Sequence, residues 1–188
     1  KLGQVEVGVG PALRYKHLFN VDPLVSTGEI ILVVLPYWDH VARDILRIVH
    51  EIEWPRPVKI KFHPVMDCRK YESMIPQKFS VTTESLNQLL SQALMVVGNS
   101  TGAMIEAASL GIPVIKVKNP NSFSHGYMPE IGKGIIWDQA EDKEEINMLV
   151  REFQKHLEDN PELLKKEGVR LRSFCFGEPT DELIGRAF

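Results

Sequence analysis

The sequence predicts an α/β fold with an open, mostly parallel sheet and helices on both faces. Two observations carry this prediction. Short β-branched runs begin at Ile30, Val58, Leu94 and Val114, and such runs are typical of strands buried on both faces of a parallel sheet. Amphipathic stretches separate these runs, and alternating strands and helices indicate βαβ units with right-handed crossovers. We therefore expect a Rossmann-like domain.

Each strand is predicted from an apolar or alternating run that proline, glycine or polar residues bound. The first run is unbroken and ends at Pro36, and the second alternates and ends at His63-Pro64. The last is the short apolar run Gly134-Ile135-Ile136-Trp137. The predicted strands are residues 30–35, 58–62, 79–82, 93–97, 113–117 and 134–137.

The helices are predicted from apolar residues at helical spacing together with start and stop signals. Asp39 is the expected N-cap of the first helix. Asn160-Pro161 marks the start of the last one, with proline at its first position. The predicted helices are residues 39–52, 67–73, 85–92, 104–110, 144–157 and 161–175.

Residues 1–28 show no sustained hydrophobic periodicity, apart from an alternation over residues 5–9 that could form a short strand. We expect them to be a linker from a missing N-terminal domain, with residues 29–188 forming the Rossmann-like domain. The sequence lacks a starting Met, and it begins in the middle of a residue pattern. We therefore expect a fragment of a longer protein. Within the linker, Arg14 either faces the missing domain or is solvated, and His17 shows no pairing partner.

The composition is that of a soluble globular protein, since 44% of the 188 residues are hydrophobic and 25% are charged. A net charge of −3 leaves no excess of positive charge for binding nucleic acid. The two cysteines, Cys68 and Cys175, lie far apart, which favours a reducing compartment. The longest apolar run, residues 30–36, is shorter than the ~20 residues of a membrane-spanning helix.

The turn after the fourth predicted strand carries the main site prediction, Gly98-Asn99-Ser100-Thr101-Gly102. Backbone N–H groups at the start of the following helix favour a phosphate. Ser100 and Thr101 add hydroxyl donors, and the glycines let a ligand approach the backbone. Glu106 lies far enough along the helix to reach a ribose hydroxyl. The alternative is that Asn99 or Ser100 only caps the helix and that Glu106 is a solvated charge.

This turn continues as Ala103-Met104-Ile105-Glu106-Ala107 and then Ser109-Leu110-Gly111-Ile112-Pro113-Val114. The whole stretch resembles the C-terminal domain of the GT-B superfamily, and it is most similar to the hydrolysing UDP-N-acetylglucosamine 2-epimerases. The resemblance implies that Ser100 and Thr101 meet the phosphates of a nucleotide sugar and that Glu106 binds the ribose. It is specific only over residues 98–114.

Lys61-Phe62-His63-Pro64 is similar to a strand-ending His-Pro motif of bacterial sialyl- and polysialyltransferases and of polyglycerolphosphate transferases. This resemblance implies that His63, with Pro64 beside it, lies at the donor phosphate as a catalytic residue. The alternative is that Pro64 only ends the strand and that His63 is a bystander. In the long loop over residues 118–133, Ser122 and His125 are candidate contacts for the sugar or diphosphate, and a plain surface loop is the alternative.

Together these resemblances imply the donor-binding C-terminal half of a GT-B glycosyltransferase in bacterial surface polysaccharide biosynthesis. The sequence has no Asp-x-Asp element, so we expect no metal and no other cofactor. Expected partners are a nucleotide-sugar donor, an acceptor glycan or lipid-linked sugar, and the missing N-terminal domain, without nucleic acid. We expect a cytoplasmic location, with the full-length protein associated peripherally with the inner face of the membrane.

Two other functions stay open. One is half of a UDP-N-acetylglucosamine 2-epimerase-like enzyme. Against it, the stretch after the first strand, Leu35-Pro36-Tyr37-Trp38-Asp39, lacks that family's basic Arg-Glu-Asn pattern. The other is a non-catalytic Rossmann-like module that binds a partner and no nucleotide.

Overall fold

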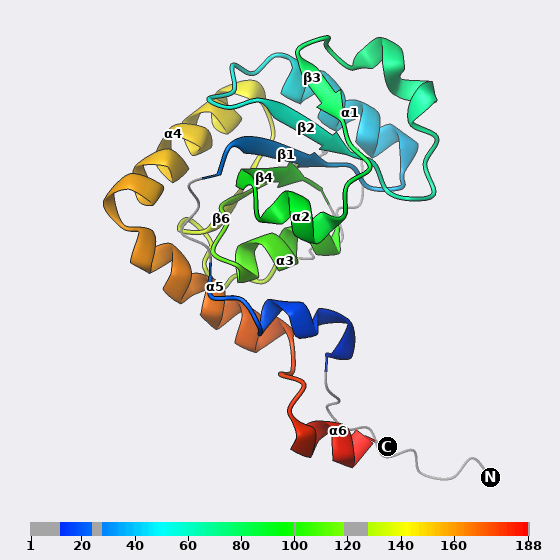
Figure 1. Cartoon of the computed structure of the whole chain (residues 1–188). Coiled ribbons are helices and arrows are strands. Elements are labelled where there is room, and N and C mark those ends of the chain that lie inside the picture. Colours follow the sequence, from blue (N-terminus) through cyan, green and yellow to red (C-terminus); the bar gives the residue numbers. More distant parts are fainter. Residues whose placement is uncertain (1–11, 24–27, 100, 119–127, 188) are drawn as a thin grey trace, which may run out of the picture.

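The protein is an α/β domain built on one six-stranded parallel sheet with the strand order β3-β2-β1-β4-β5-β6 (Figure 1). The structure is a computed structural model, and it describes residues 12–23, 28–99, 101–118 and 128–187. All five strand pairs are parallel, which confirms the predicted Rossmann-like fold. The strands are β1 (Ile30–Val34), β2 (Val58–Lys61), β3 (Phe79–Val81), β4 (Ala93–Gly98), β5 (Val114–Val117) and β6 (Trp137–Ala140).

Helices connect the strands and cover both faces of the sheet. The α-helices are α1 (Asp39–His50), α2 (Leu86–Leu90), α3 (Gly102–Ser109), α4 (Lys143–Asp159), α5 (Pro161–Cys175) and α6 (Asp181–Ala187). The 3-10 helices are η1 (Leu13–Leu18) and η2 (Cys68–Met74). None of the helices in the described ranges has the length and apolar character needed to cross a membrane.

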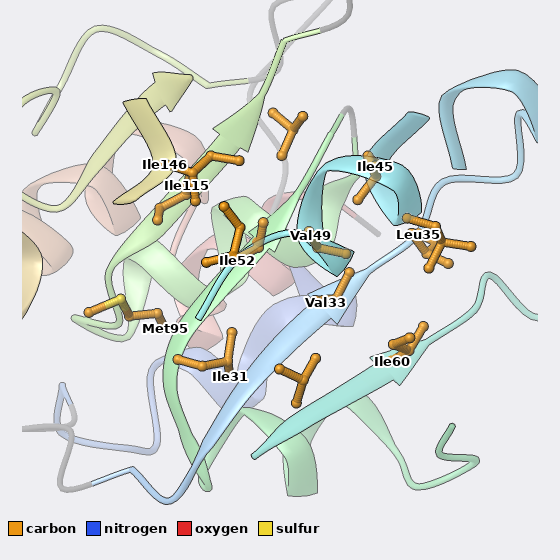
Figure 2. Close-up of a cluster of buried hydrophobic side chains, with 14 of the residues drawn as sticks. Ile31, Val33, Leu35, Ile45, Val49, Ile52, Ile60, Met95, Ile115 and Ile146 are labelled. Carbon is orange, nitrogen blue, oxygen red and sulfur yellow. The ribbon is translucent and has the colours of Figure 1, made fainter. Parts of the chain in front are cut away.

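The sheet separates two hydrophobic cores, because neighbouring residues of its central strands point to opposite faces. On one face, Ile31 and Val33 of β1 meet Ile45 and Val49 of α1, as Figure 2 shows. Ile146 of α4 joins this first core. The second core, on the other face, contains residues of η1, α2, α3 and α5. The predicted helices on both faces are confirmed.

Strand β1 lies between β2 and β4, so the ends of these three strands meet at one edge of the sheet. Val34, the last residue of β1, is in register with Lys61 on one side and with Gly98 on the other. The segment that follows β2 begins with Phe62-His63, and the turn that follows β4 begins at Asn99. Two motifs that are 35 positions apart at His63 and Gly98 are therefore neighbours at the carboxyl edge.

Two local predictions were wrong. The last strand begins at Trp137, where the prediction ended, because Gly132 and Gly134 adopt φ values of 73° and 75° and turn the chain first. Asp39 is not the N-cap of α1, since Trp38 holds that position. The Asp39 carboxylate instead accepts hydrogen bonds from Arg43 Nε at 2.8 Å and from the Tyr71 hydroxyl at 2.6 Å.

Two helices were not predicted. η1 lies within the segment assigned to a linker, and α6 lies beyond the last predicted helix. The expected strand over residues 5–9 lies outside the described residues. The domain boundary at residue 28 stays a prediction, although η1 contributes the fully buried Leu18 to the second core.

Candidate functional site

A cleft of about 430 Å³ lies at the carboxyl edge of the sheet, where the ends of β1 and β2 face η1 and the start of α3. Its walls include Arg14, His63, Thr101 and Glu106. Another hollow, of about 470 Å³, lies where β2 and β3 begin and is lined by residues 53–58 with Lys78 and Phe79. In an open parallel sheet, ligands bind outside the carboxyl ends of the strands, so the first cleft is the candidate site.

The start of α3 forms one wall of this cleft. Thr101 is its N-cap, and the Thr101 hydroxyl oxygen accepts a hydrogen bond from the Ala103 N–H at 3.3 Å. The alternative that Asn99 or Ser100 caps this helix is therefore wrong. A Cβ atom built on Gly102 would meet no heavy atom within 4 Å. The first turn of α3 is thus open on the Gly102 side, where its backbone N–H groups and positive dipole end favour an anion.

Gly98 and Asn99, the first two residues of the turn at 98–102, have structural roles. Asn99 is buried, and its side-chain Nδ2 donates a hydrogen bond to the Val117 carbonyl oxygen at 2.5 Å, which ties the end of β4 to the end of β5. A Cβ atom on Gly98 would lie 2.6 Å from Val34 Cγ2 and 2.7 Å from the Val34 carbonyl oxygen. Close packing against β1 thus accounts for the glycine at position 98.

His63 and Pro64 form the opposite wall, directly after β2. The Val65 N–H donates a long hydrogen bond of 3.4 Å to His63 Nδ1, and the His63 ring meets the Tyr37 ring edge-on with 5.7 Å between their centroids. When Nδ1 accepts this bond, the neutral imidazole carries its proton on Nε2. His63 then has an Nε2–H group that can donate to an oxygen of a ligand.

Glu106 and His17 form a pair on the η1 side of the cleft. His17 Nε2 lies 3.4 Å from Glu106 Oε2, and the Glu106 side chain is only 9% exposed. The His17 Nε2 atom is buried and makes no hydrogen bond within the described chain. The pair is therefore in electrostatic contact without an optimal hydrogen bond, and Glu106 is the member of the pair that lines the cleft.

The charge of Glu106 is disfavoured in the ligand-free protein. Burial raises the pKa of this carboxyl, and the neighbouring His17 and Arg14 oppose the rise. Arg14 is exposed and lines the same cleft. Hydroxyl groups that donate to the Glu106 oxygens would stabilise the ionised form, which agrees with the predicted ribose contact.

The position of η1 depends on the end of α5. Arg172 NH1 donates hydrogen bonds to the carbonyl oxygens of Leu18 and Val21, the latter at 3.3 Å. The rings of Tyr15 and Phe176 pack with 4.4 Å between their centroids. Figure 1 shows this arrangement as the blue segment lying against the orange helix. α5 thus holds η1 in place, with Arg14 in the cleft wall and His17 beside Glu106.

Replacing Arg172 with Met is expected to loosen η1, because two backbone carbonyls lose a charged donor. We expect amide hydrogen exchange over residues 13–20 to become about tenfold faster or more. Lys165→Met on the same helix is the matched control, since Lys165 forms an i,i+3 ion pair with Glu162 of its own helix. Equal exchange of η1 in both variants would contradict the anchoring role of Arg172.

The structure brings five predicted site residues to one cleft: His63, Pro64, Thr101, Gly102 and Glu106. Gly98 and Asn99 lie at the end of β4 beside it. Ser100, Ser122 and His125 lie outside the described residues. Sequence reasoning missed the contact between His17 and Glu106, and also the place of Arg14 and Tyr15 in the cleft wall. No local pattern in the sequence joins residues so far apart.

Comparisons with solved structures agree with this architecture. Anabaena Alr3699/HepE, solved with UDP-glucose, matches with a TM-score of 0.57 at 7% identity over 79% of this chain and 45% of its own. The glycosyltransferase SnogD from Streptomyces nogalater matches with a TM-score of 0.52 at 14% identity, over 88% and 44%. No protein-family model and no curated protein matches the sequence.

The UDP-GlcNAc 2-epimerase of Methanocaldococcus jannaschii, solved with UDP-GlcNAc and UDP, matches with a TM-score of 0.51 at 16% identity, over 86% of this chain and 48% of its own. The chain has the fold of one half of a GT-B protein. It spans less than half the length of each of these three solved chains. Such a match fits the C-terminal half that the sequence predicts.

Proposed function

We propose that this GT-B half binds the donor of a glycosyltransferase, which transfers a sugar from a nucleotide-activated donor in surface polysaccharide biosynthesis. The observation that carries the proposal is the shared cleft. It places a helix start that favours phosphate, a carboxylate that can accept from ribose hydroxyls, and a histidine donor around one space. Two of the solved proteins that share the fold were solved with a UDP-sugar.

Each group has a distinct role in this proposal. The backbone N–H groups at the start of α3 and the Thr101 hydroxyl hold a phosphate, and Glu106 accepts hydrogen bonds from the 2′- and 3′-hydroxyls of the ribose. His63 donates to a phosphate oxygen and stabilises the negative charge that develops on the leaving diphosphate. In this proposal, the binding site for the acceptor, a glycan or a lipid-linked sugar, and the general base would lie mainly in an N-terminal domain.

Calorimetry with UDP, CDP and CMP tests this proposal. We expect weak binding, because half of a cleft leaves much of the donor in water. Thr101→Val and Ser100→Ala are expected to weaken it by ~1.5–3 kcal/mol for each charge-assisted hydrogen bond that is lost. Ser91→Ala, at the C-cap of α2 and outside the cleft wall, serves as the hydroxyl-deletion control. If both site variants bind these nucleotides as tightly as the wild type, the turn at residues 98–102 is not part of the binding site.

An epimerase-like enzyme is the second candidate, favoured by the similarity of residues 98–114 to that family. It is distinguished from a transferase by supplying the full-length protein with a nucleotide sugar and no acceptor. Epimerised or hydrolysed sugar would select the epimerase. If no nucleotide raises the melting temperature, the chain is instead a non-catalytic interaction module.

A further inference from the structure

Lys116 is a buried cation on β5, the strand next to the edge strand β6. It occupies the third position of β5, Val114-Ile115-Lys116-Val117, and is only 5% exposed. Its neighbours Ile115 and Val117 belong to the first core, so Lys116 points to the opposite face, which α3 and α5 cover. It is in register with Gly98 on β4 and with Gln139 on β6.

Within the described part of the chain, Lys116 lacks the carboxylate partner that its neighbouring lysines have. Lys118 Nζ lies 2.5 Å from Glu141 Oε1, and Lys133 Nζ lies 3.6 Å from Glu130 Oε2. The Lys116 ammonium makes no hydrogen bond or ion pair with any other residue of the described ranges. Residues 119–127 contain neither Asp nor Glu. Burial, with the charges of Lys118 and Lys133, lowers the pKa of Lys116, as expected for an ammonium group without a counter-ion.

The start of α3 adds to this positive potential. Gly98, the register neighbour of Lys116, is followed after a short turn by the first residue of α3, Gly102. A helix start carries a partial positive charge, so α3 and Lys116 together favour an anion at this edge. The two lie on the same face of the sheet, where α3 contacts both β4 and β5.

The topology separates Lys116 from the nucleoside side of the cleft. Val34, Leu35 and His63 line the cleft on the β1 and β2 side of β4, whereas β5 lies on the other side of β4. Lys116 does not itself line this cleft. With the ribose at Glu106 and one phosphate at the start of α3, a second phosphate that continued away from β1 and β2 would approach the end of β5.

We propose that Lys116 binds the outer phosphate of a nucleoside diphosphate, the one that carries the sugar in a donor. This inference rests on the proposed function and adds a specificity for diphosphates over monophosphates. The Lys116 ammonium would neutralise charge on the leaving diphosphate from the β5 side, while His63 acts from the β2 side.

The test compares Lys116→Met with the matched charge deletion Lys118→Met in titrations with UDP and with UMP. In the wild type we expect UDP to bind more tightly than UMP. Lys116→Met is expected to reduce this preference about tenfold or more, with UMP affinity within about twofold of wild type. Lys118→Met should keep the preference. The proposal would be overturned if Lys116→Met lowered the affinities for UDP and UMP equally, or lowered neither.

A second measurement separates this inference from the proposed function. Inorganic pyrophosphate should protect Lys116, and not Lys118, from acetylation by acetic anhydride, read by peptide mass spectrometry. If pyrophosphate protects Lys116 but no nucleotide binds, Lys116 belongs to an anion site and the proposed nucleotide function is wrong. If a nucleotide binds but pyrophosphate does not protect Lys116, only the proposed role of Lys116 is wrong. In the ligand-free protein, Lys116→Met should also raise the melting temperature, because it removes a buried charge that forms no ion pair with any residue of the described ranges.

Discussion

Glu106→Gln is expected to stabilise the ligand-free protein at pH 7 and to weaken its binding of a nucleotide. Glutamine keeps the shape of the side chain and removes a buried negative charge, which the raised pKa of Glu106 shows to be disfavoured. In the complex, the variant loses part of the charge-assisted hydrogen bonding to the ribose, with a cost of about 1 kcal/mol. Thermal unfolding and calorimetry measure the two effects.

The stability effect has a defined pH dependence. The folded pKa of Glu106 lies above the unfolded value of 4.5, so the folded state holds this proton more tightly than the unfolded state. Its contribution to stability is present below pH 4.5 and is lost as the pH rises through the folded pKa. The variant and the wild type should therefore unfold at similar temperatures near the unfolded pKa and below it, and the variant should become the more stable one at higher pH.

A 2′,3′-dideoxy nucleotide is the control for the binding effect, since it has no hydroxyl for Glu106 to bind. We expect Glu106→Gln to change its affinity little. If the substitution weakens both ligands equally, Glu106 is not the ribose contact. A variant that is less stable than wild type at pH 7 would contradict the account of its buried charge.

Gly168→Ala is expected to destabilise the fold by about 1–3 kcal/mol, because it forces α5 away from the end of α3. A Cβ atom at this position would lie 2.8 Å from the Gly111 backbone nitrogen and 2.9 Å from the Ala108 carbonyl oxygen. Both are main-chain atoms that cannot rotate aside. The clash opposes the gain of ~1 kcal/mol that alanine brings to a helix interior.

Gly185→Ala is the matched control. Gly185 also lies in a helix, α6, but a Cβ atom there would meet no heavy atom within 4 Å. Denaturant titrations should show a lower midpoint for Gly168→Ala and no loss for Gly185→Ala. Equal stability of the two variants would mean that α3 and α5 can separate at little cost.

The sequence was most informative where burial and periodicity coincide. The apolar runs predicted β1, β4 and β5 within about a residue, because a strand buried on both faces excludes polar side chains. The role of Lys116 was not predicted, because this residue lies inside one of these apolar runs. Its charge within Val-Ile-Lys-Val is the signal that could have identified it as a buried cation. β6 was misplaced because the glycines at 132 and 134 turn the chain after the apolar run has begun.

The site could be predicted in part. Parallel topology alone brings His63 and the turn at 98–102 to one edge, and the structure places His63, Thr101 and Glu106 in the walls of one cleft. The contribution of η1 could not be predicted, since a 3-10 helix leaves no strong period. Its docking depends on tertiary contacts with the end of α5, which are made through the Arg172 and Phe176 side chains.

The anchoring of η1 also has a mechanical consequence. The Ala12 N–H donates a hydrogen bond of 2.9 Å to the Gly177 carbonyl oxygen, so two positions that are far apart in the sequence lie side by side. Arg172 bonds to Leu18 of η1, and η1 also carries His17, which contacts the Glu106 carboxylate. A displacement of this corner would therefore shift His17 relative to Glu106 in the cleft wall, at a distance from the segments that moved.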